Sequence, residues 1–382
     1  MYSNLRTNLP TDLMTFREVP YNPSTPTFPS HKHVLNYLEN YSKNNDLNRF
    51  VKFRTKVVDI RHSVHVIPYK HDCVMPQIQN DGYKRWIVEY ENLSDKKVTV
   101  DDFDYIVNAN GHYVNNYIPY IEGLWTFTGN LLHSRWWRDP LKYRGKKVIV
   151  IGSRSSGYDL CRELAWLNVH PTNVDSPYQS KSSNPELEYT KIIQVCRTPS
   201  PPWENAPEWY KDINSKPPIT SIKNDTVRFE DGSEESQVDA IVFATGYNYM
   251  FPFINHSQQP FKTSPVVSNP NSDVVLKSEK KIPPTKILNG DIPDSHKGHR
   301  GVVNLSRHQI FYLNDPTLVF VGLLRNIRPF SLWEAQAHVC FYFIFKHTST
   351  KVLHFYRLLH MHFQNQMNGY LIDYLKKLKT SV

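Results

Sequence analysis

Residues 147–157 read Lys-Val-Ile-Val-Ile-Gly-Ser-Arg-Ser-Ser-Gly, a short apolar run followed by a turn that begins and ends with glycine. Leu160 and Leu164 follow at helical spacing, so we predict a buried strand over 147–151 and a helix over 158–167. A dinucleotide-binding unit has this order: the first glycine permits a sharp turn, the last lets helix and strand approach, and the helix N-terminus offers N–H groups to a pyrophosphate. A plain strand-to-helix turn would give the same pattern.

Two arginines bear on what this unit would bind. Arg154 stands at the middle position, where dinucleotide-binding loops usually carry glycine. Its side chain would either clash with a pyrophosphate or swing outward and pair with it. Residues 192–197 read as the next strand and end at Arg197, where an arginine suits a 2′-phosphate and favours NADP over NAD. A solvated arginine at a strand end is the simple alternative.

Two stretches of the chain echo each other. Residues 104–112 read Asp-Tyr-Ile-Val-Asn-Ala-Asn-Gly-His, and residues 239–247 read Asp-Ala-Ile-Val-Phe-Ala-Thr-Gly-Tyr. Each is an acidic residue, an apolar strand, then a polar residue and a glycine where the backbone turns. Each also follows a stretch that resembles a β-meander. Buried parallel strands look alike by chance, and the alternative is that the chain holds two related nucleotide-binding units, with one glycine loop between them.

Composition limits the class of protein. The chain has 382 residues, 40% hydrophobic and 21% charged, which indicates a folded protein of two or three domains. The net charge of +9 is spread along the chain, so we expect no nucleic-acid partner. Four cysteines without Cys-x-x-Cys spacing predict reduced thiols, no metal site and a cytoplasmic location. The longest apolar run, 339–345, is too short for a transmembrane segment.

Other periodic stretches predict further elements. Ser30 can cap a helix that continues to Asn44 and Asn45, and the alternating stretches 51–60 and 85–90 read as strands of a small sheet. Beyond Ala337, apolar and aromatic residues recur at helical spacing. Core packing is the default interpretation of that tail, and a helix lying on the surface of an internal membrane is the alternative.

Several motifs together resemble one known family, the flavin-containing monooxygenases, and most closely their fungal branch. Residues 127–133, Phe-Thr-Gly-Asn-Leu-Leu-His, match the family pattern Phe-x-Gly-x-x-x-His-x-x-x-(Tyr/Phe), except that the final aromatic residue is Trp137. The similarity extends from Met1 to about Ala337. The other matching stretches are 5–8, 13–14, 28–30, 110–113, 118–119, 133–134, 244–247 and 315–318.

The resemblance implies an α/β flavoprotein with two dinucleotide-binding domains. A Rossmann-like NADPH domain over 144–245 would be inserted into an FAD domain made of 1–143 and 246–382, with a C-terminal helical tail. Family members open with a strand and a Gly-x-Gly-x-x-Gly turn for FAD, whereas this sequence begins at a later motif. We therefore expect an incomplete FAD domain that lacks its first βαβ unit and has unpaired sheet edges.

The family chemistry implies the function. NADPH reduces FAD, O₂ adds to the reduced flavin, and the C4a-hydroperoxide oxygenates a soft nucleophile, an amine nitrogen or a sulfur, as in N,N-dimethylaniline monooxygenases. The protein supplies orientation and excludes water. The alternative is an N-terminally truncated, catalytically inactive remnant that still binds NADP(H). Expected partners are O₂ and a small amine or sulfur substrate.

The resemblance also implies roles for particular residues. Asn8 would line the reactive edge of the flavin as the catalytic residue, although a turn residue beside Pro10 is the simple alternative. Gln336 would approach the flavin ring, and Arg197 the 2′-phosphate. His133 is more simply a satisfied hydrogen-bond partner than an acid or base. The remaining expected cofactor contacts are Gly152, Ser153, Arg154, Ser155, Ser156, Gly157, Thr245 and Gly246.

Overall fold

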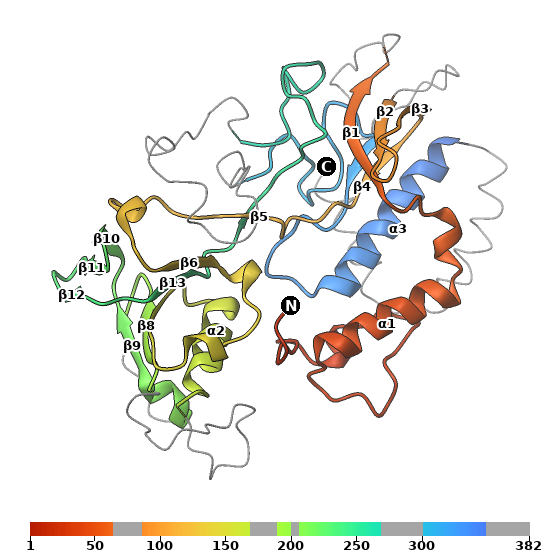
Figure 1. The fold of residues 1–382 in the computed structure, drawn as a ribbon. Helices are drawn as coiled ribbons and strands as arrows, with labels where there is room; N and C mark the ends of the chain where they lie inside the picture. Colours follow the sequence, from red (N-terminus) through yellow and green to blue (C-terminus); the bar gives the residue numbers. More distant parts are fainter. Residues whose placement is uncertain (64–85, 169–188, 200–205, 269–300, 349–382) are drawn as a thin grey trace. The chain divides into compact units, whose positions relative to one another are not determined.

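The computed structural model describes residues 1–63, 86–168, 189–199, 206–268 and 301–348 (Figure 1). Backbone contacts divide the chain into two compact units. Unit 1 contains Met1–Asn8 and Tyr113–Asn248, and unit 2 contains Leu9–His112, Tyr249–Asn271 and the chain from Gly301 onward. The assignment of 144–245 to NADPH and of the flanking segments to FAD stays a prediction.

A five-stranded parallel sheet forms the centre of unit 1. Its strand order is β6 (Asn130–His133), β13 (Ala240–Phe243), β7 (Lys147–Ile151), β8 (Lys191–Val195) and β9 (Ile213–Lys216). Every residue of β13 is buried. Parallel strands covered on both faces read as continuous apolar runs, which is why the sequences of β7 and β13 stand out.

Helix α2 (Ser155–Ala165) packs on this sheet with one apolar face. Its fully buried apolar side chains are Cys161, Leu164 and Ala165, which join Val148 and Val150 of β7 and Ile192 of β8 in one core cluster. The helix therefore follows β7 directly through the glycine turn, as the order of strand, turn and helix predicts.

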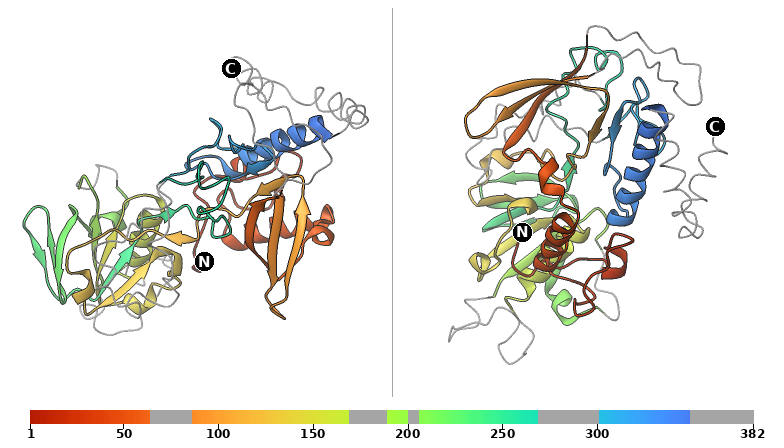
Figure 2. Two further views of the ribbon diagram at one scale, coloured as in Figure 1. Left: turned by 90° about the horizontal axis from the view of Figure 1, so that it is seen from above. Right: turned by 90° about the vertical axis from the view of Figure 1, so that its right-hand side faces the viewer.

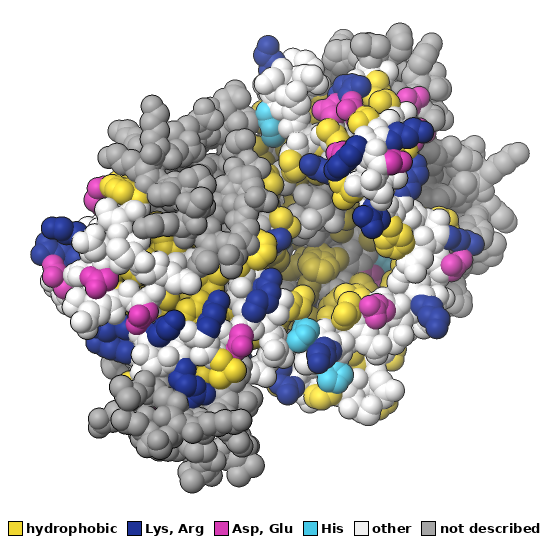
Figure 3. All heavy atoms as spheres, in the orientation of Figure 1, with side chains coloured by type: hydrophobic (Ala, Val, Ile, Leu, Met, Phe, Trp, Pro, Cys, Tyr) yellow, Lys and Arg dark blue, Asp and Glu magenta, His cyan; other side chains and the backbone are white. Residues whose placement is uncertain are grey.

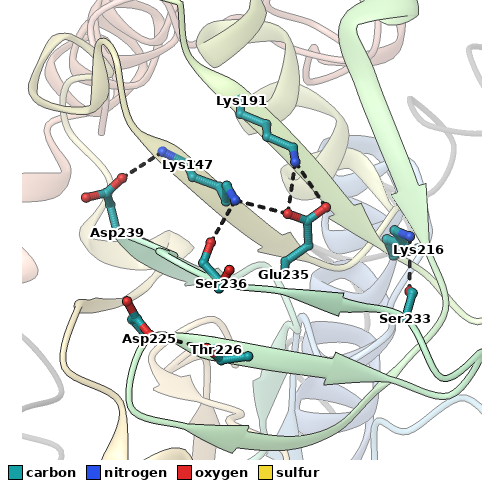
Figure 4. A network of polar contacts seen from close by, with 9 residues as sticks. All are labelled: Lys147, Lys191, Lys216, Asp225, Thr226, Ser233, Glu235, Ser236 and Asp239. Atoms are coloured by element: carbon teal, nitrogen blue, oxygen red, sulfur yellow. Dashed lines mark hydrogen bonds and ion pairs between the residues drawn. The ribbon is translucent and has the colours of Figure 1, made fainter.

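Smaller elements complete unit 1. They are the antiparallel sheet β10 (Ile219–Lys223), β11 (Thr226–Phe229) and β12 (Glu234–Glu235), the ribbon of β5 (Asn115–Asn116) and β14 (Tyr247–Asn248), and the short 3₁₀ turns η3 (Leu124–Thr126), η4 (Ser134–Trp136), η5 (Leu141–Tyr143) and η7 (Glu208–Asp212). Glu235 of β12 bonds to Lys147 and Lys191, which begin β7 and β8 (Figure 4).

Unit 2 combines an antiparallel sheet, a parallel pair and two long helices. The sheet is β1 (Thr55–His62), β2 (Trp86–Asn92) and β3 (Val98–Phe103), and β4 (Ile106–Asn108) pairs in parallel with β15 (Leu318–Phe320). The helices are α1 (His31–Asn44) and α3 (Pro329–Thr348), with the 3₁₀ turns η1 (Thr11–Leu13) and η2 (Leu47–Phe50) (Figure 2). Trp86, Phe261 and Phe320 lie in its core.

Several predicted boundaries differ from the structure, and α2 also ends at Ala165 instead of residue 167. The first strand begins at Thr55, not at residue 51, because Arg54 adopts a left-handed φ of 54° that interrupts the extended chain. Helix α2 begins three residues earlier than predicted, at Ser155, because Arg154 serves as its N-cap. The strand predicted over 192–197 ends at Val195, so Arg197 lies beyond it. Residues 353–358 of the aromatic tail lie outside the described residues.

Charged side chains are mixed on the face that Figure 3 shows, with Lys and Arg interspersed among Asp and Glu and no single basic patch. Among the described helices, none is both long enough and apolar enough to cross a lipid bilayer.

Candidate coenzyme-binding site

The candidate site lies at the carboxyl ends of β7 and β13. From β7 the sheet continues through β8 to β9 in one direction, while β13 and β6 lie on the other side. The strand order therefore reverses between β7 and β13, and open parallel sheets bind ligands at such a switch point, beyond the carboxyl ends of the strands.

Glycine is required at both ends of the turn that follows β7. Gly152 has a φ of +122°, and a Cβ atom there would lie 2.5 Å from the carbonyl oxygen of Ala244, at the end of β13. A Cβ atom on Gly157 would collide with the carbonyl oxygen of Gly152. Two of the three roles of a dinucleotide-binding glycine loop, the tight turn and the close helix packing, are thus present.

Hydrogen bonds from β8 hold the turn in place. The Gly152 amide donates to the carbonyl of Val195 over 2.9 Å, and the side-chain amide of Gln194 donates to the carbonyl of Gly152 over 3.3 Å. Gln194 is buried, so this contact is protected from water. Sequence reasoning missed Gln194, because its neighbours gave no sign that its side chain points along the sheet toward the turn.

The first turn of α2 has the backbone features that anion-binding helix ends share. Tyr158 donates its amide to the carbonyl of Arg154 over 2.9 Å, so the amides before it have no acceptor within the helix. The residues of the loop from Ser153 to Ser156 are exposed. The N-terminus of a helix carries a partial positive charge and N–H groups that can bind an anion. Serine hydroxyl groups lie beside these N–H groups, and Gly152 and Gly157 have no side chain that would block the approach. This arrangement fits a pyrophosphate.

Arg154 does not strain the loop. Its φ of −82° and ψ of −174° lie in the ordinary extended region, so the backbone needs no glycine there. Arg154 and Arg197 are both exposed, and within the described part of the chain neither guanidinium group has a hydrogen-bond or ion-pair partner. Both residues follow the carboxyl ends of their strands, β7 and β8.

The opposite edge of the sheet is electrostatically balanced. Glu235 lies 3.1 Å from the Lys147 ammonium and 2.9 Å from that of Lys191, and Asp239 accepts the Lys147 amide over 2.8 Å (Figure 4). Burial by itself would raise the pKa of Glu235, but the hydrogen bonds from the two lysines outweigh it and lower that pKa. These contacts neutralise the amino-terminal edge, away from the candidate site.

Thr245 and Gly246, which follow β13, are held by their own network. The Thr245 hydroxyl donates to the carbonyl of Tyr117, and the Gly246 carbonyl accepts the Tyr117 amide over 2.9 Å. His133 also donates to the Gly246 carbonyl, with 3.0 Å between Nε2 and the oxygen. The predicted strand-end residues thus lie at the carboxyl edge together with the glycine turn.

His133 is a structural residue. Its Nδ1 accepts the Arg135 amide over 3.1 Å, so the proton must reside on Nε2, where it bonds to Gly246. Burial lowers the pKa of His133 to about 4. A neutral ring with both nitrogens engaged is a satisfied hydrogen-bond partner, the simpler of the two interpretations.

Asn8 lies next to the glycine loop. Its Nδ2 is 3.4 Å from the Ser155 hydroxyl oxygen, a long hydrogen bond on the surface of unit 1. Two residues that sequence reasoning did not select, Tyr2 and Asn4, bond to Asp159 and Glu163 over 3.0 and 3.4 Å. The three helix partners are four residues apart on one face of α2, so the helix holds the segment that carries Asn8.

Gln336 belongs to unit 2, on α3, and is buried. Its Oε1 accepts the amide of Gly322 over 3.0 Å, and its Nε2 donates to the carbonyl of His308 over 3.4 Å. Both ends of the amide are therefore occupied by backbone groups. Gln336 fixes the turn after β15, and any contact with a flavin ring stays a prediction.

The fold and site define an α/β dinucleotide-binding protein with the glycine loop of a nucleotide coenzyme domain. The family described as flavin-binding monooxygenase-like matches residues 1–170 and 209–268, more than half of the chain. The chain belongs to this family of flavin monooxygenases, whose members use FAD and NADPH.

Individual curated relatives are consistent with this family assignment. "Flavin-containing monooxygenase FMO GS-OX5" of Arabidopsis thaliana is 30% identical over 67% of this chain and 48% of its own length. "Thiol-specific monooxygenase" of Saccharomyces cerevisiae is 27% identical over 89% of this chain and 64% of its own. This chain thus spans about half to two thirds of the length of these curated relatives.

Solved structures are similar in fold. The S-allyl-L-cysteine S-oxygenase of Allium sativum superposes with a TM-score of 0.61 at 25% identity, covering 88% of this chain and 61% of its own. The Tmm protein of Pelagibacter gives a TM-score of 0.60 at 21% identity over 89% and 60% of the two chains. The two-dinucleotide-binding-domain fold expected from the sequence is confirmed.

Proposed function

We propose that this protein works as an NADPH- and O₂-dependent flavin monooxygenase that oxygenates a soft nucleophile, an amine nitrogen or a sulfur. The observation that carries the proposal is the loop from Gly152 to Gly157 at the switch point of a parallel sheet, in a chain of the flavin-binding monooxygenase-like family. Relatives named for thiol and trimethylamine oxygenation support the substrate class.

The glycine loop would hold NADPH. The amides at the start of α2 and the hydroxyl groups of Ser153, Ser155 and Ser156 would bind the pyrophosphate. Arg154, with an unstrained backbone and an exposed side chain, would pair with the same group from outside. Arg197, beyond the end of β8, would bind the 2′-phosphate and select NADPH over NADH.

Thr245 and Gly246 would position the coenzyme at the end of β13. Their backbone is fixed by Tyr117 and His133, so the site is formed before the coenzyme arrives. Asn8, held at the loop by Ser155, would present its carboxamide as a hydrogen-bond donor to the reacting oxygen. The chain's own contribution is thus orientation and hydrogen bonding.

FAD, when bound, would accept hydride from NADPH and activate O₂. The described residues of unit 2 fit it only in part. Among the described residues of unit 2, β15 leads through Gly322 into α3, but this connection holds one glycine instead of two. Gln336 already bonds to Gly322 and His308. We therefore assign no FAD pyrophosphate contact to this part of the chain.

That mismatch favours one second candidate, a protein that binds NADP(H) without oxygenating a substrate. Purified protein separates the two candidates. Visible absorption would report bound flavin, and NADPH-dependent uptake of O₂ with a thiol or a tertiary amine would report the reaction. Yellow protein with both activities supports the monooxygenase. Colourless protein that binds NADPH and consumes no O₂ supports the second candidate, and protein that does not bind NADPH contradicts both.

A further inference from the structure

The loop that follows β8 carries a threonine to which the proposed function gives no role. Residues 196–201 read Cys-Arg-Thr-Pro-Ser-Pro, so Thr198 stands between Arg197 and Pro199. The structure describes this loop as far as Pro199, and Arg197, Thr198 and Pro199 are all exposed. Among the described residues, neither the Thr198 hydroxyl nor the Arg197 guanidinium has a hydrogen-bond partner. An exposed hydroxyl and an exposed cation therefore occupy adjacent positions of one loop.

Backbone hydrogen bonds fix the start of this loop relative to the glycine turn. The Cys196 amide donates to the carbonyl of Lys216 in β9 over 3.0 Å. The Val195 carbonyl accepts the Gly152 amide over 2.9 Å. Thr198 is three residues beyond Val195, and three peptide units span at most about 11 Å. That span is comparable with the distance of about 10 Å over which salt screens charges, so a charge on Thr198 would act on an anion at the turn.

The surroundings of Thr198 meet the requirements of a protein kinase substrate. A kinase needs an acceptor hydroxyl in an accessible and locally extended segment, and surface loops provide such segments. Pro199 disfavours helical backbone at Thr198 and so keeps the acceptor extended. Serine/threonine kinases of the proline-directed class recognise a proline directly after the acceptor residue. Ser200 also precedes a proline in the sequence, but it lies outside the described residues.

We propose that a proline-directed kinase phosphorylates Thr198 and that the resulting phosphate takes the place of the coenzyme's 2′-phosphate at Arg197. In this transfer the Thr198 oxygen bonds to the γ-phosphorus of ATP. The bond between that phosphorus and the oxygen that stays with ADP breaks, and the hydroxyl proton passes to a base of the kinase. The regulatory effect rests on the proposed function, because that function assigns Arg197 to the 2′-phosphate of NADPH.

Electrostatics gives the direction of the effect. Phosphothreonine carries a charge of about −1.5 to −2 near pH 7 and three acceptor oxygens, which is also the chemistry of a 2′-phosphate. The Cα atoms of Thr198 and Arg197 are about 3.8 Å apart as neighbours in the chain, so the flexible arginine side chain can pair with this group. The modified loop would satisfy Arg197 internally and repel NADPH. NADH lacks the 2′-phosphate, so its affinity should change less.

Phosphorylation of the full chain in vitro tests this inference. The protein carries Ser200→Ala, so that Thr198 is the remaining hydroxyl acceptor in residues 196–201. It is treated with ATP and a purified proline-directed kinase, and peptide mass spectrometry locates the phosphate. Dissociation constants for NADPH and NADH are measured before and after treatment. We expect phosphate on Thr198, NADPH binding weakened about 10- to 100-fold and NADH binding changed less than about threefold. A phosphatase should restore the original affinity.

Variants at the two neighbouring positions make the result specific. Thr198→Glu adds one negative charge and should weaken NADPH binding about three- to tenfold. Thr198→Gln has a similar size without the charge and should leave NADPH binding unchanged. Arg197→Gln has already lost the contact with the 2′-phosphate, so phosphorylation of this variant should weaken NADPH binding by a smaller factor than it does when Arg197 is present.

Two results would overturn this inference alone. In the first, the kinase modifies a synthetic peptide of residues 192–203 and leaves Thr198 of the folded protein unmodified. In the second, Thr198 is modified and the ratio of the NADPH and NADH dissociation constants stays the same. A third result has a wider meaning. If the unmodified protein does not bind NADPH, the proposed function fails and the inference fails with it.

Discussion

The side-chain amide nitrogen of Asn8 lies 3.4 Å from the hydroxyl oxygen of Ser155, although 147 positions separate the two residues. One was expected to be catalytic and the other to bind a pyrophosphate, and they lie together on unit 1. The proposed catalytic amide and the loop proposed to bind the coenzyme would then lie side by side in unit 1.

Replacing either partner should separate the two roles. Ser155→Ala removes one hydroxyl donor and should weaken NADPH binding about three- to tenfold, corresponding to roughly 0.5–1.5 kcal/mol. Asn8→Ala should lower the rate of substrate oxygenation and change NADPH affinity less than Ser155→Ala. Titration of NADPH fluorescence and O₂ uptake measure the two effects, with Ser94→Ala, in the turn between β2 and β3 of unit 2, as the control.

Gly157→Ala should damage the loop. The added Cβ would collide with the Gly152 carbonyl, so α2 must move away from β7. We expect a loss of about 1–3 kcal/mol in the free energy of unfolding, with weaker NADPH binding. Urea unfolding measures the first. Gly301→Ala is the matched control, because its Cβ would lie 3.7 Å from the nearest atom. Equal stability of the two variants would contradict the packing argument.

Arg197→Gln tests coenzyme selection. If Arg197 binds the 2′-phosphate, losing a charged hydrogen bond of roughly 1.5–3 kcal/mol should weaken NADPH binding about 10- to 100-fold. NADH affinity should stay the same, because NADH lacks that phosphate. An unchanged ratio of the two dissociation constants would show that the arginine is only solvated.

Arg154→Gly gives a different pattern, because the pyrophosphate is common to both coenzymes. If Arg154 pairs with the pyrophosphate, its replacement by glycine should weaken the binding of NADPH and of NADH by the same factor. Unchanged affinity for both would show that the side chain is harmless, and tighter binding would show that it obstructs the loop. Isothermal titration with each coenzyme distinguishes these outcomes.

Acid should destabilise the protein through His133. Its pKa is about 4 in the folded protein against an ordinary value of 6.5, so the unfolded chain takes up the proton first as the pH falls. Through this group alone, the free energy of unfolding should fall by about 3 kcal/mol between pH 6.5 and pH 4. Urea unfolding across this range, with His133→Asn for comparison, measures it. Parallel pH profiles of the two proteins would refute this assignment.

Sequence reasoning succeeded where local pattern determines structure. The apolar run 147–151 became β7 at the predicted bounds, and α1 followed Ser30 to Asn44 as its spacing indicates. The interrupted strand at Arg54 was not foreseen, because a left-handed φ at arginine has no sequence signal. Because apolar residues alternate on both sides of Arg54, the predicted strand began at residue 51, four residues before the observed start at Thr55.

The site was predictable in its loop but not in its supports. The loop could be recognised from its glycines, because the φ of +122° at Gly152 is a conformation that other residues rarely adopt. Gln194, Tyr2 and Asn4 act through tertiary contacts with residues far along the chain, and the sequence contains no local trace of such pairs. Gln336 was selected by family resemblance, whereas its amide is engaged with backbone groups.

The charges of Lys147 and Lys191 are balanced by Glu235 and Asp239, while Arg154 and Arg197 have no counter-ion among the described residues. Among the described residues, the amino-terminal edge of the central sheet of unit 1 is therefore neutralised, whereas its carboxyl edge carries two positive charges. A polyanionic dinucleotide that diffuses toward it is drawn to the rim where the strands finish, before any specific contact forms. Added salt should slow this association and leave the rate of release much less affected, since exposed charges are screened over about 10 Å.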